Sequence, residues 1–241
     1  VQVQNLPRNS LADLDLARQL LKDGNYELLE LLYDSVPDVL SQLIRTALIP
    51  EPGCRFIVSD FSAIEARVIA WLADEKWRMD VFSGHGKIYE ASASQMFGVP
   101  VEEITKDSPL RQKGKIAELA LGYGGAVGAL KAMGALDMGL GENELPELVK
   151  TWRASNPNIT KFWWDVGNAA MDAVANKSTV QVHHGIEFSY ESGGLFLRLP
   201  SGRRLCYVQP QIKPHHKFNK PTVTFMGTKT GKTWGRIETY G

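Results

Sequence analysis

One aspartate stands where sheet proteins often present a group to a ligand. Asp60 follows residues 55–58, a short apolar segment whose β-branched side chains predict a strand inside a sheet. Beyond it, Ser62 is a suitable helix N-cap with Glu65 three residues later, and apolar residues then recur at helical spacing. The pattern predicts a strand that runs into a helix with Asp60 between them, which makes Asp60 the first candidate for chemistry.

Two cations form the second candidate. Ser108 and the proline after it predict the start of a helix, which is expected to run as far as Tyr123. Arg111 and Lys115 stand four residues apart on it, so they share one helix face. Like charges at this spacing repel each other mildly, and Glu118 is the acid that offsets them, so the arrangement favours an external anion. The alternative is a solvated basic face.

The segment DFSAIEAR at residues 60–67 resembles motif A of the family A DNA polymerases, which reads D-Y/F-S-x-I-E-x-R. The resemblance implies that Asp60 and the backbone carbonyl of Phe61 hold the two catalytic Mg²⁺ ions. It implies that Glu65 blocks a ribose 2′-hydroxyl and that Arg67 lies near the primer and template strands. For Glu65 there is a plain alternative, because Ser62 and Glu65 also form a capping box.

The cationic helix resembles motif B of the same family, R-x-x-x-K-x-x-x-F/Y-x-x-x-Y-G. The resemblance implies that Arg111 and Lys115 bind the triphosphate of a dNTP and that Lys115 can protonate the leaving pyrophosphate. Tyr123 matches the tyrosine on which a base stacks, whereas Leu119 replaces an aromatic that packs on the deoxyribose. Packing of Leu119 and Tyr123 against the core is the alternative.

Three further segments match the family less closely. Tyr89, in a helix predicted over 88–97, stands where the family often has a histidine close to the triphosphate, although a buried helix–helix contact would also explain it. Gln4 and Asn5 match a Q-N-(I/L)-P segment that lies near primer and template in the family, although a polar loop closed by a proline would also explain them. LPSGRRL at residues 199–205 resembles a family hairpin, so Arg203 and Arg204 are candidate DNA contacts.

The C-terminal part of the chain is basic although the formal net charge is zero. No acid occurs from 192 to 237, whereas nine basic residues do: Arg198, Arg203, Arg204, Lys213, Lys217, Lys220, Lys229, Lys232 and Arg236. Such a run is typical of a phosphate-backbone surface. The alternative is an edge hairpin that lysines protect from aggregation.

The remaining pattern predicts an α+β fold. Helices are expected over 11–32, with a break at Gly24, and over 36–48, 74–84, 144–155 and 159–175, the last with a core cluster at Phe162, Trp163 and Trp164. Short strands are expected over 179–182, 186–190, 195–199 and 204–208. TGKT at residues 230–233 is predicted to be a hairpin turn and not a P-loop.

The resemblance implies an architecture of a mostly helical fingers subdomain attached to part of an antiparallel palm sheet. Residues 1–73 would be palm with motif A, 74–177 the fingers, and 178–241 hairpins that return to the palm. The H-D-E hairpin called motif C and the thumb are missing from the sequence. The chain is therefore expected to be a monomeric fragment, inactive alone, of an enzyme that acts on primer-template DNA and dNTPs.

The composition limits the class of protein, its location and its possible metal sites. The chain has 241 residues, 44% of them hydrophobic, enough for a substantial core, and it shows no secretory signal and no membrane-spanning apolar run. Cys54 and Cys206 lack metal-ligand spacing, which favours a cytoplasmic location. The histidine pairs at 183–184 and 215–216 are expected to diverge in strands and to bind no zinc.

Two other functions remain open at this stage. A non-catalytic nucleic-acid-binding module would also explain the basic run. A single-subunit RNA polymerase would share the metal-binding aspartate and the cationic helix, but Glu65 argues against it.

Overall fold

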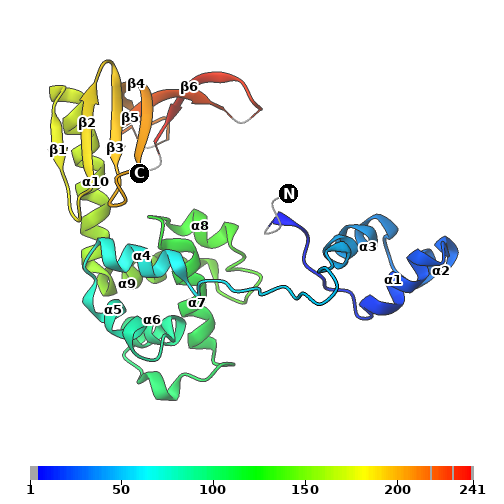
Figure 1. The fold of residues 1–241 in the computed structure, drawn as a ribbon. Helices are drawn as coiled ribbons and strands as arrows, with labels where there is room; N and C mark the ends of the chain where they lie inside the picture. The colour runs from blue at the N-terminus through cyan, green and yellow to red at the C-terminus, as the bar shows by residue number, and fades with distance from the viewer. Residues whose placement is uncertain (1–4, 218, 230, 240–241) are drawn as a thin grey trace. The chain divides into compact units, whose positions relative to one another are not determined.

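The structure is a computed structural model that describes residues 5–217, 219–229 and 231–239 (Figure 1). The chain divides into two compact units, Val1–Asp60 and Phe61–Gly241. The fold is α+β, with helices in both units and an antiparallel sheet in the second, as the sequence predicts. Among the described residues, no helix has both the length and the apolar character needed to cross a bilayer.

The first unit is a small helical cluster. It contains α1 (Leu14–Lys22), α2 (Tyr26–Leu32), α3 (Val36–Leu43) and a 3₁₀ turn at Ile44–Ala47. The predicted break is confirmed: Gly24 has a φ of 66°, and Asn25 caps α2 by accepting a hydrogen bond from the amide of Leu28. Apolar residues from all three α-helices form its core: Ala17, Leu20, Leu29, Val36, Val39 and Leu43.

The predicted strand at residues 55–58 is wrong. These residues are extended but pair with no strand in the described part of the chain, and Ile57 and Val58 are 85% and 90% exposed. A β-strand needs a neighbouring ladder for its backbone groups and an apolar surface for its side chains. The described strands all lie in residues 179–238 and pair with one another, so β propensity alone leaves this segment without a partner.

The second unit begins with helices that surround one core. They are α4 (Ile64–Leu72), α5 (Lys76–Ser83), α6 (Ile88–Phe97), α7 (Pro109–Leu121), α8 (Val127–Ala132), α9 (Leu145–Ser155) and α10 (Pro157–Asn176). Ser108 caps α7 by accepting a hydrogen bond from the amide of Leu110, as its type predicts, and Gly98 ends α6 with a φ of 69°. Short 3₁₀ turns lie at Val101–Glu103 and Glu142–Glu144.

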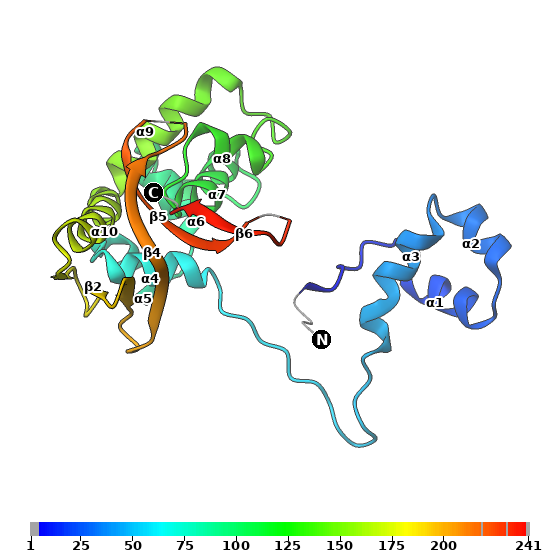
Figure 2. The ribbon, with the colours of Figure 1, turned by 90° about the horizontal axis from the view of Figure 1, so that it is seen from above.

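A six-stranded antiparallel sheet follows within the described residues, with its strands in sequence order. The strands are β1 (Thr179–Gln181), β2 (Glu187–Glu191), β3 (Gly194–Arg198), β4 (Arg204–Pro214), β5 (Pro221–Thr228) and β6 (Trp234–Glu238). Strand β4 is long and curved (Figure 2), and its register with β5 shifts between Val208 and Gln211. Lys229 and Lys232 flank the turn between β5 and β6, which confirms the hairpin there, although Thr230 lies outside the described residues.

Helix α10 lies along the sheet and joins it to the other helices (Figure 1). Phe162 on this helix is buried, and Trp163 packs against the core and stacks on Trp152 of α9, as predicted. Trp164 is 62% exposed, so its assignment to the core is wrong. Three consecutive residues span most of a helical turn, and the third therefore faces away from the core that holds the first.

Gly114 sets the distance between α6 and α7. A Cβ at this position would lie 2.3 Å from the carbonyl oxygen of Tyr89 and 3.1 Å from the Cβ of Ala93. Both neighbours belong to α6, and the nearer one is backbone, which cannot swing aside. The two helices can pack this closely only because residue 114 has no side chain.

We expect Gly114→Ala to lower the free energy of unfolding of the second unit by about 1–3 kcal/mol, because the helices must separate. Gly167→Ala is the matched control, since a Cβ there meets nothing within 4 Å and alanine favours helix by up to about 1 kcal/mol. All tryptophans lie in the second unit, so their fluorescence during urea denaturation reports its unfolding. Equal effects of the two substitutions would contradict the packing argument.

Candidate active site

Asp60 and Phe61 lie at the junction of the two units. Asp60 ends the first unit and Phe61 begins the second, and both are exposed in the extended segment before α4. A carboxylate and a carbonyl oxygen suit Mg²⁺ in kind. Of the groups of three or more potential ligand side chains within the described residues, none includes Asp60. The metal-binding role of Asp60 and Phe61 therefore stays a prediction.

The prediction of a capping box at Ser62 and Glu65 is wrong. Helix α4 has Ala63 as its N-cap, with a left-handed φ of 50° and no side-chain hydrogen bond. Because the helix begins one residue later than the sequence pattern suggests, Ser62 and Glu65 do not occupy the two positions that a capping box requires. The carboxylate of Glu65 is therefore available for another partner.

That partner is Tyr123. The Tyr123 hydroxyl lies close enough to the Glu65 carboxylate for the two groups to interact electrostatically. Partial burial, followed by the negative charge of Glu65, raises the pKa of Tyr123 above its ordinary value. Two predicted nucleotide-binding residues, one from each motif, thus lie near each other within the second unit.

Tyr123 lies beyond the end of the cationic helix. Helix α7 ends at Leu121, so the expectation that one helix carries residues 111–123 is wrong at its C-terminal end. The glycines that follow explain the end: Gly124 has a φ of 78°, and a Cβ on Gly125 would lie 2.2 Å from the carbonyl oxygen of Ala120. Tyr123 is 74% exposed, and Leu119 on α7 is also exposed, so neither is committed to the core.

Arg111 is held by residues of α6. Its Nε donates a hydrogen bond of 2.7 Å to Oε1 of Glu90, and its guanidinium lies 5.6 Å from the centre of the Tyr89 ring. The structure thus brings together Arg111 and Tyr89, which the sequence predicts as nucleotide-binding residues, and adds Glu90, which the sequence analysis missed. A pocket of about 440 Å³ opens beside them, with Lys87 and Lys106 also in its lining.

The lysines of α7 differ in their partners. Lys113 pairs with Glu144 at 2.8 Å, whereas Lys115 makes no ion pair or side-chain hydrogen bond with any residue that the structure describes. Glu118 does not offset the charge of Lys115 as the sequence suggests, because it is buried and paired with Arg78 of α5. Lys115 is therefore the α7 cation that is available to an external anion.

The predicted DNA contacts differ in their surroundings. Arg67 donates from Nε to the carbonyl oxygen of Ser62 and stacks over Phe82 at 4.4 Å. Arg204 pairs with Glu191 at 2.7 Å, whereas Arg203 is exposed in the turn before β4. These contacts leave the DNA-binding roles as predictions. Asn5 is exposed in the first unit, and Gln4 lies outside the described residues.

The prediction that the adjacent histidines diverge is wrong. His183 and His184 both direct Nε2 to the carboxylate of Asp74, and the second pair, His215 and His216, converges on Glu238. The divergence rule assumes a strand, but each pair lies outside the strands, and His184 has a φ of 49°.

The sequence as a whole is similar to known polymerases. The model of the family described as DNA polymerase family A matches residues 35–184. The chain is 64% identical over its full length to a DNA polymerase of Bacillus phage SP02, of which it covers 37%. It is 34% identical over 120 residues to DNA polymerase I of Pseudomonas aeruginosa, a match that covers 49% of the chain and 12% of that relative. The chain thus spans about a third of the phage relative and a smaller share of the bacterial one.

We expect Lys115→Ala to weaken the binding of inorganic triphosphate to the chain roughly tenfold to a hundredfold, since a hydrogen bond to a charged group contributes about 1.5–3 kcal/mol. Isothermal titration calorimetry measures the Kd. Lys113→Ala is the matched control on the same helix, and its exposed pair with Glu144 should make its effect less than about threefold. A Kd that changes equally in the two variants would exclude the special role of Lys115.

Proposed function

Because the chain belongs to DNA polymerase family A, we propose that its parent protein carries out template-directed DNA synthesis. In this reaction a primer 3′-hydroxyl attacks the α-phosphate of a dNTP and pyrophosphate leaves. The partners would be primer-template DNA and dNTPs. The chain spans 37% of its phage relative, so the activity is proposed for the parent and not for this chain alone.

The observation that carries the proposal is the proximity of Glu65 and Tyr123. Glu65 belongs to the motif A segment and Tyr123 to the motif B segment, far apart in sequence, and their interaction brings the two segments together in one unit. A polymerase requires this proximity, because the groups that bind the sugar and those that bind the base and phosphates of one nucleotide must lie side by side.

In the proposed mechanism the cations of α7 bind the triphosphate. Lys115 is unpaired among the described residues and would neutralise the charge that develops on the leaving pyrophosphate, with a proton available on Nζ. Arg111 would contribute a second charge, and Glu90 would compete with the triphosphate for it. Tyr89 would support the Arg111 guanidinium with the face of its ring.

The sugar and base would meet residues at the end of the same helix. Tyr123 would offer its exposed ring for stacking, with its hydroxyl near the Glu65 carboxylate. Glu65 would exclude a ribose 2′-hydroxyl. Leu119 offers an apolar side chain, without an aromatic face, to the deoxyribose.

Asp60 and the Phe61 carbonyl would hold Mg²⁺ in the parent. When bound, Mg²⁺ supplies Lewis-acid activation of the primer hydroxyl and charge neutralisation at the phosphates. One carboxylate and one carbonyl provide few of the six ligands that Mg²⁺ takes, so the chain alone should bind it weakly. We therefore propose that the palm and fingers assignments hold for the parent and that this fragment is inactive by itself.

Primer extension with the full-length parent tests the proposal. We expect the parent to extend a primer according to its template and Lys115→Ala to lower kcat/KM by about 10²–10³-fold, the usual effect of removing one electrostatic stabiliser of a transition state. Lys113→Ala serves as the control and should stay near the parental value. The 241-residue chain alone should give no extension, and templated synthesis by it would contradict the fragment interpretation.

A non-catalytic nucleic-acid-binding module is the second candidate function, and the acid-free basic run from 192 to 237 favours it. We expect the chain to bind duplex DNA with an affinity that falls as salt rises. Arg203→Ala should reduce the slope of log K against log salt by about 1. Arg204→Ala should change it less, because Glu191 already neutralises that side chain.

Fluorescence anisotropy with a labelled duplex over a series of salt concentrations provides the measurement. Binding that does not depend on salt would contradict a phosphate-backbone surface, and a larger effect of Arg204→Ala would contradict the role given to Arg203.

A further inference from the structure

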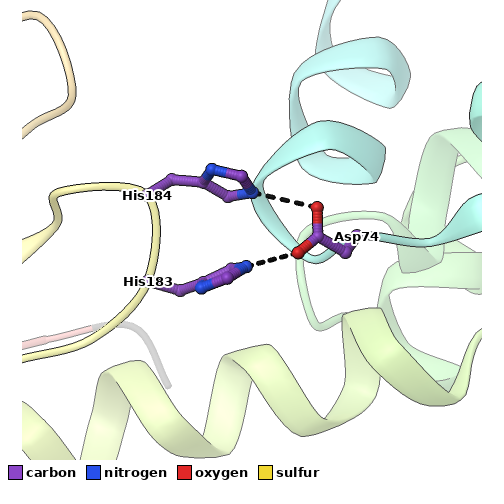
Figure 3. Close-up of side chains that lie close together, drawn as sticks. All are labelled: Asp74, His183 and His184. Carbon is purple, nitrogen blue, oxygen red and sulfur yellow. Dashed lines mark hydrogen bonds and ion pairs between the residues drawn. The ribbon is translucent and has the colours of Figure 1, made fainter.

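Two histidines and an aspartate, remote in sequence, meet at a corner of the second unit. Asp74 follows α4, and His183 and His184 form the connection between β1 and β2 (Figure 3). None of the three has a role in the proposed polymerase site. We propose that they form a binding site for Zn²⁺ that clamps the α4–α5 corner to the β1–β2 turn.

The three side chains already direct their ligand atoms to one point. Nε2 of His183 contacts Oδ2 of Asp74, and Nε2 of His184 lies 3.0 Å from Oδ1 of the same carboxylate. All three ligand atoms lie within 4.8 Å of one another. Tetrahedral Zn²⁺ with bonds of about 2.0–2.2 Å separates its ligands by about 3.4 Å, so small rotations of these side chains would admit the ion.

The backbone around Asp74 is fixed by contacts that do not involve the histidines. Asp74 has a left-handed φ of 52°, and its carbonyl oxygen accepts a hydrogen bond of 2.8 Å from Nδ2 of Asn158. The carboxylate of the next residue, Glu75, accepts hydrogen bonds from the amides of Asn158 and Ile159 at the start of α10. The aspartate is thus presented by a rigid corner, as a metal ligand should be.

The histidines are also held in position. The amide of Ile186 donates to the carbonyl oxygen of His183 at 2.9 Å, and both residues inside this turn, His184 and Gly185, have a positive φ. This conformation costs free energy for a residue with a Cβ, and such strain concentrates at functional positions. The ring of His184 also stacks on Trp71 of α4, with 4.5 Å between the ring centres.

The donor set indicates the class of metal. Imidazole nitrogens suit Zn²⁺ and similar transition metals, whereas Mg²⁺ and Ca²⁺ prefer oxygen ligands. Two histidines and one carboxylate leave a fourth position for water. That position has access to solvent, because His183 lines a groove of about 570 Å³ between α10 and β1.

A second cluster provides an internal control. Three other potential ligands also lie close together, near the ends of β4 and β6: His215, His216 and Glu238. It shares no residue with the Asp74 cluster, so a substitution in one leaves the ligands of the other in place.

Isothermal titration calorimetry of the tag-free chain with Zn²⁺ at neutral pH tests the proposal. We expect the chain to lose one equivalent of bound Zn²⁺, or at least about tenfold in affinity, in each of His183→Ala, His184→Ala and Asp74→Asn. His216→Ala should keep that equivalent. Circular dichroism of each variant establishes that it is folded, and Asp74→Asn keeps the shape of the side chain if an alanine variant is not.

A second measurement separates a clamp from a surface-bound ion. Zn²⁺ should raise the Tm of the chain and of His216→Ala but not that of His184→Ala, because only binding to the folded cluster stabilises it. The proposal is overturned if the unsubstituted chain binds no Zn²⁺, which would leave an ion pair only. It is also overturned if Asp74→Asn and His184→Ala bind as many equivalents of Zn²⁺, and as tightly, as the unsubstituted chain, or if binding disappears in His216→Ala.

Discussion

The buried pair between Arg78 and Glu118 orients the helices of the second unit. Two hydrogen bonds join the guanidinium to the carboxylate, and neighbours add two more: Nε1 of Trp152 donates to Glu118 at 2.9 Å, and Nη1 of Arg78 donates to Asn156 at 3.0 Å. Nε of Arg78 is buried without a hydrogen-bond partner among the described residues. Burying an ionised group costs much free energy unless the group is paired with an opposite charge and hydrogen-bonded, as these two groups are. The pair therefore holds α5, α7 and the α9–α10 junction in one arrangement. The position of Lys115 on α7 depends on this arrangement.

This arrangement explains why the charges of α7 have different uses although they stand close together in sequence. Glu118 faces inward to Arg78, Lys113 reaches Glu144, and Arg111 reaches Glu90. Each of these three charges is neutralised by a partner within the protein and needs no ligand. Lys115 lies between them and has no described partner, so the helix is internally neutralised at every charged position except the one that the motif assigns to the triphosphate.

Local signals in the sequence predict the helices well, and long-range contacts explain the failures. The limits of α6 and the start of α7 follow from Gly98 and Ser108, which act on adjacent backbone groups. The strand expected at 55–58 depends on a neighbouring strand that propensity cannot supply. The resemblance to motifs A and B names the residues of the site, but the proximity of Glu65 to Tyr123 and the meeting of His183 with Asp74 depend on tertiary structure. The residue types of Glu65, Tyr123, His183 and Asp74 do not by themselves indicate that these pairs meet.

The missing side chain at Gly114 has a mechanical consequence. Since α6 and α7 touch backbone to backbone, neither helix can slide or rotate against the other without a steric clash. Arg111 would therefore travel together with Tyr89 and Glu90 in any rearrangement, and their geometry would be preserved throughout. The two helices therefore move as one rigid body. Any flexibility lies in connecting segments such as the glycine-rich residues 122–125.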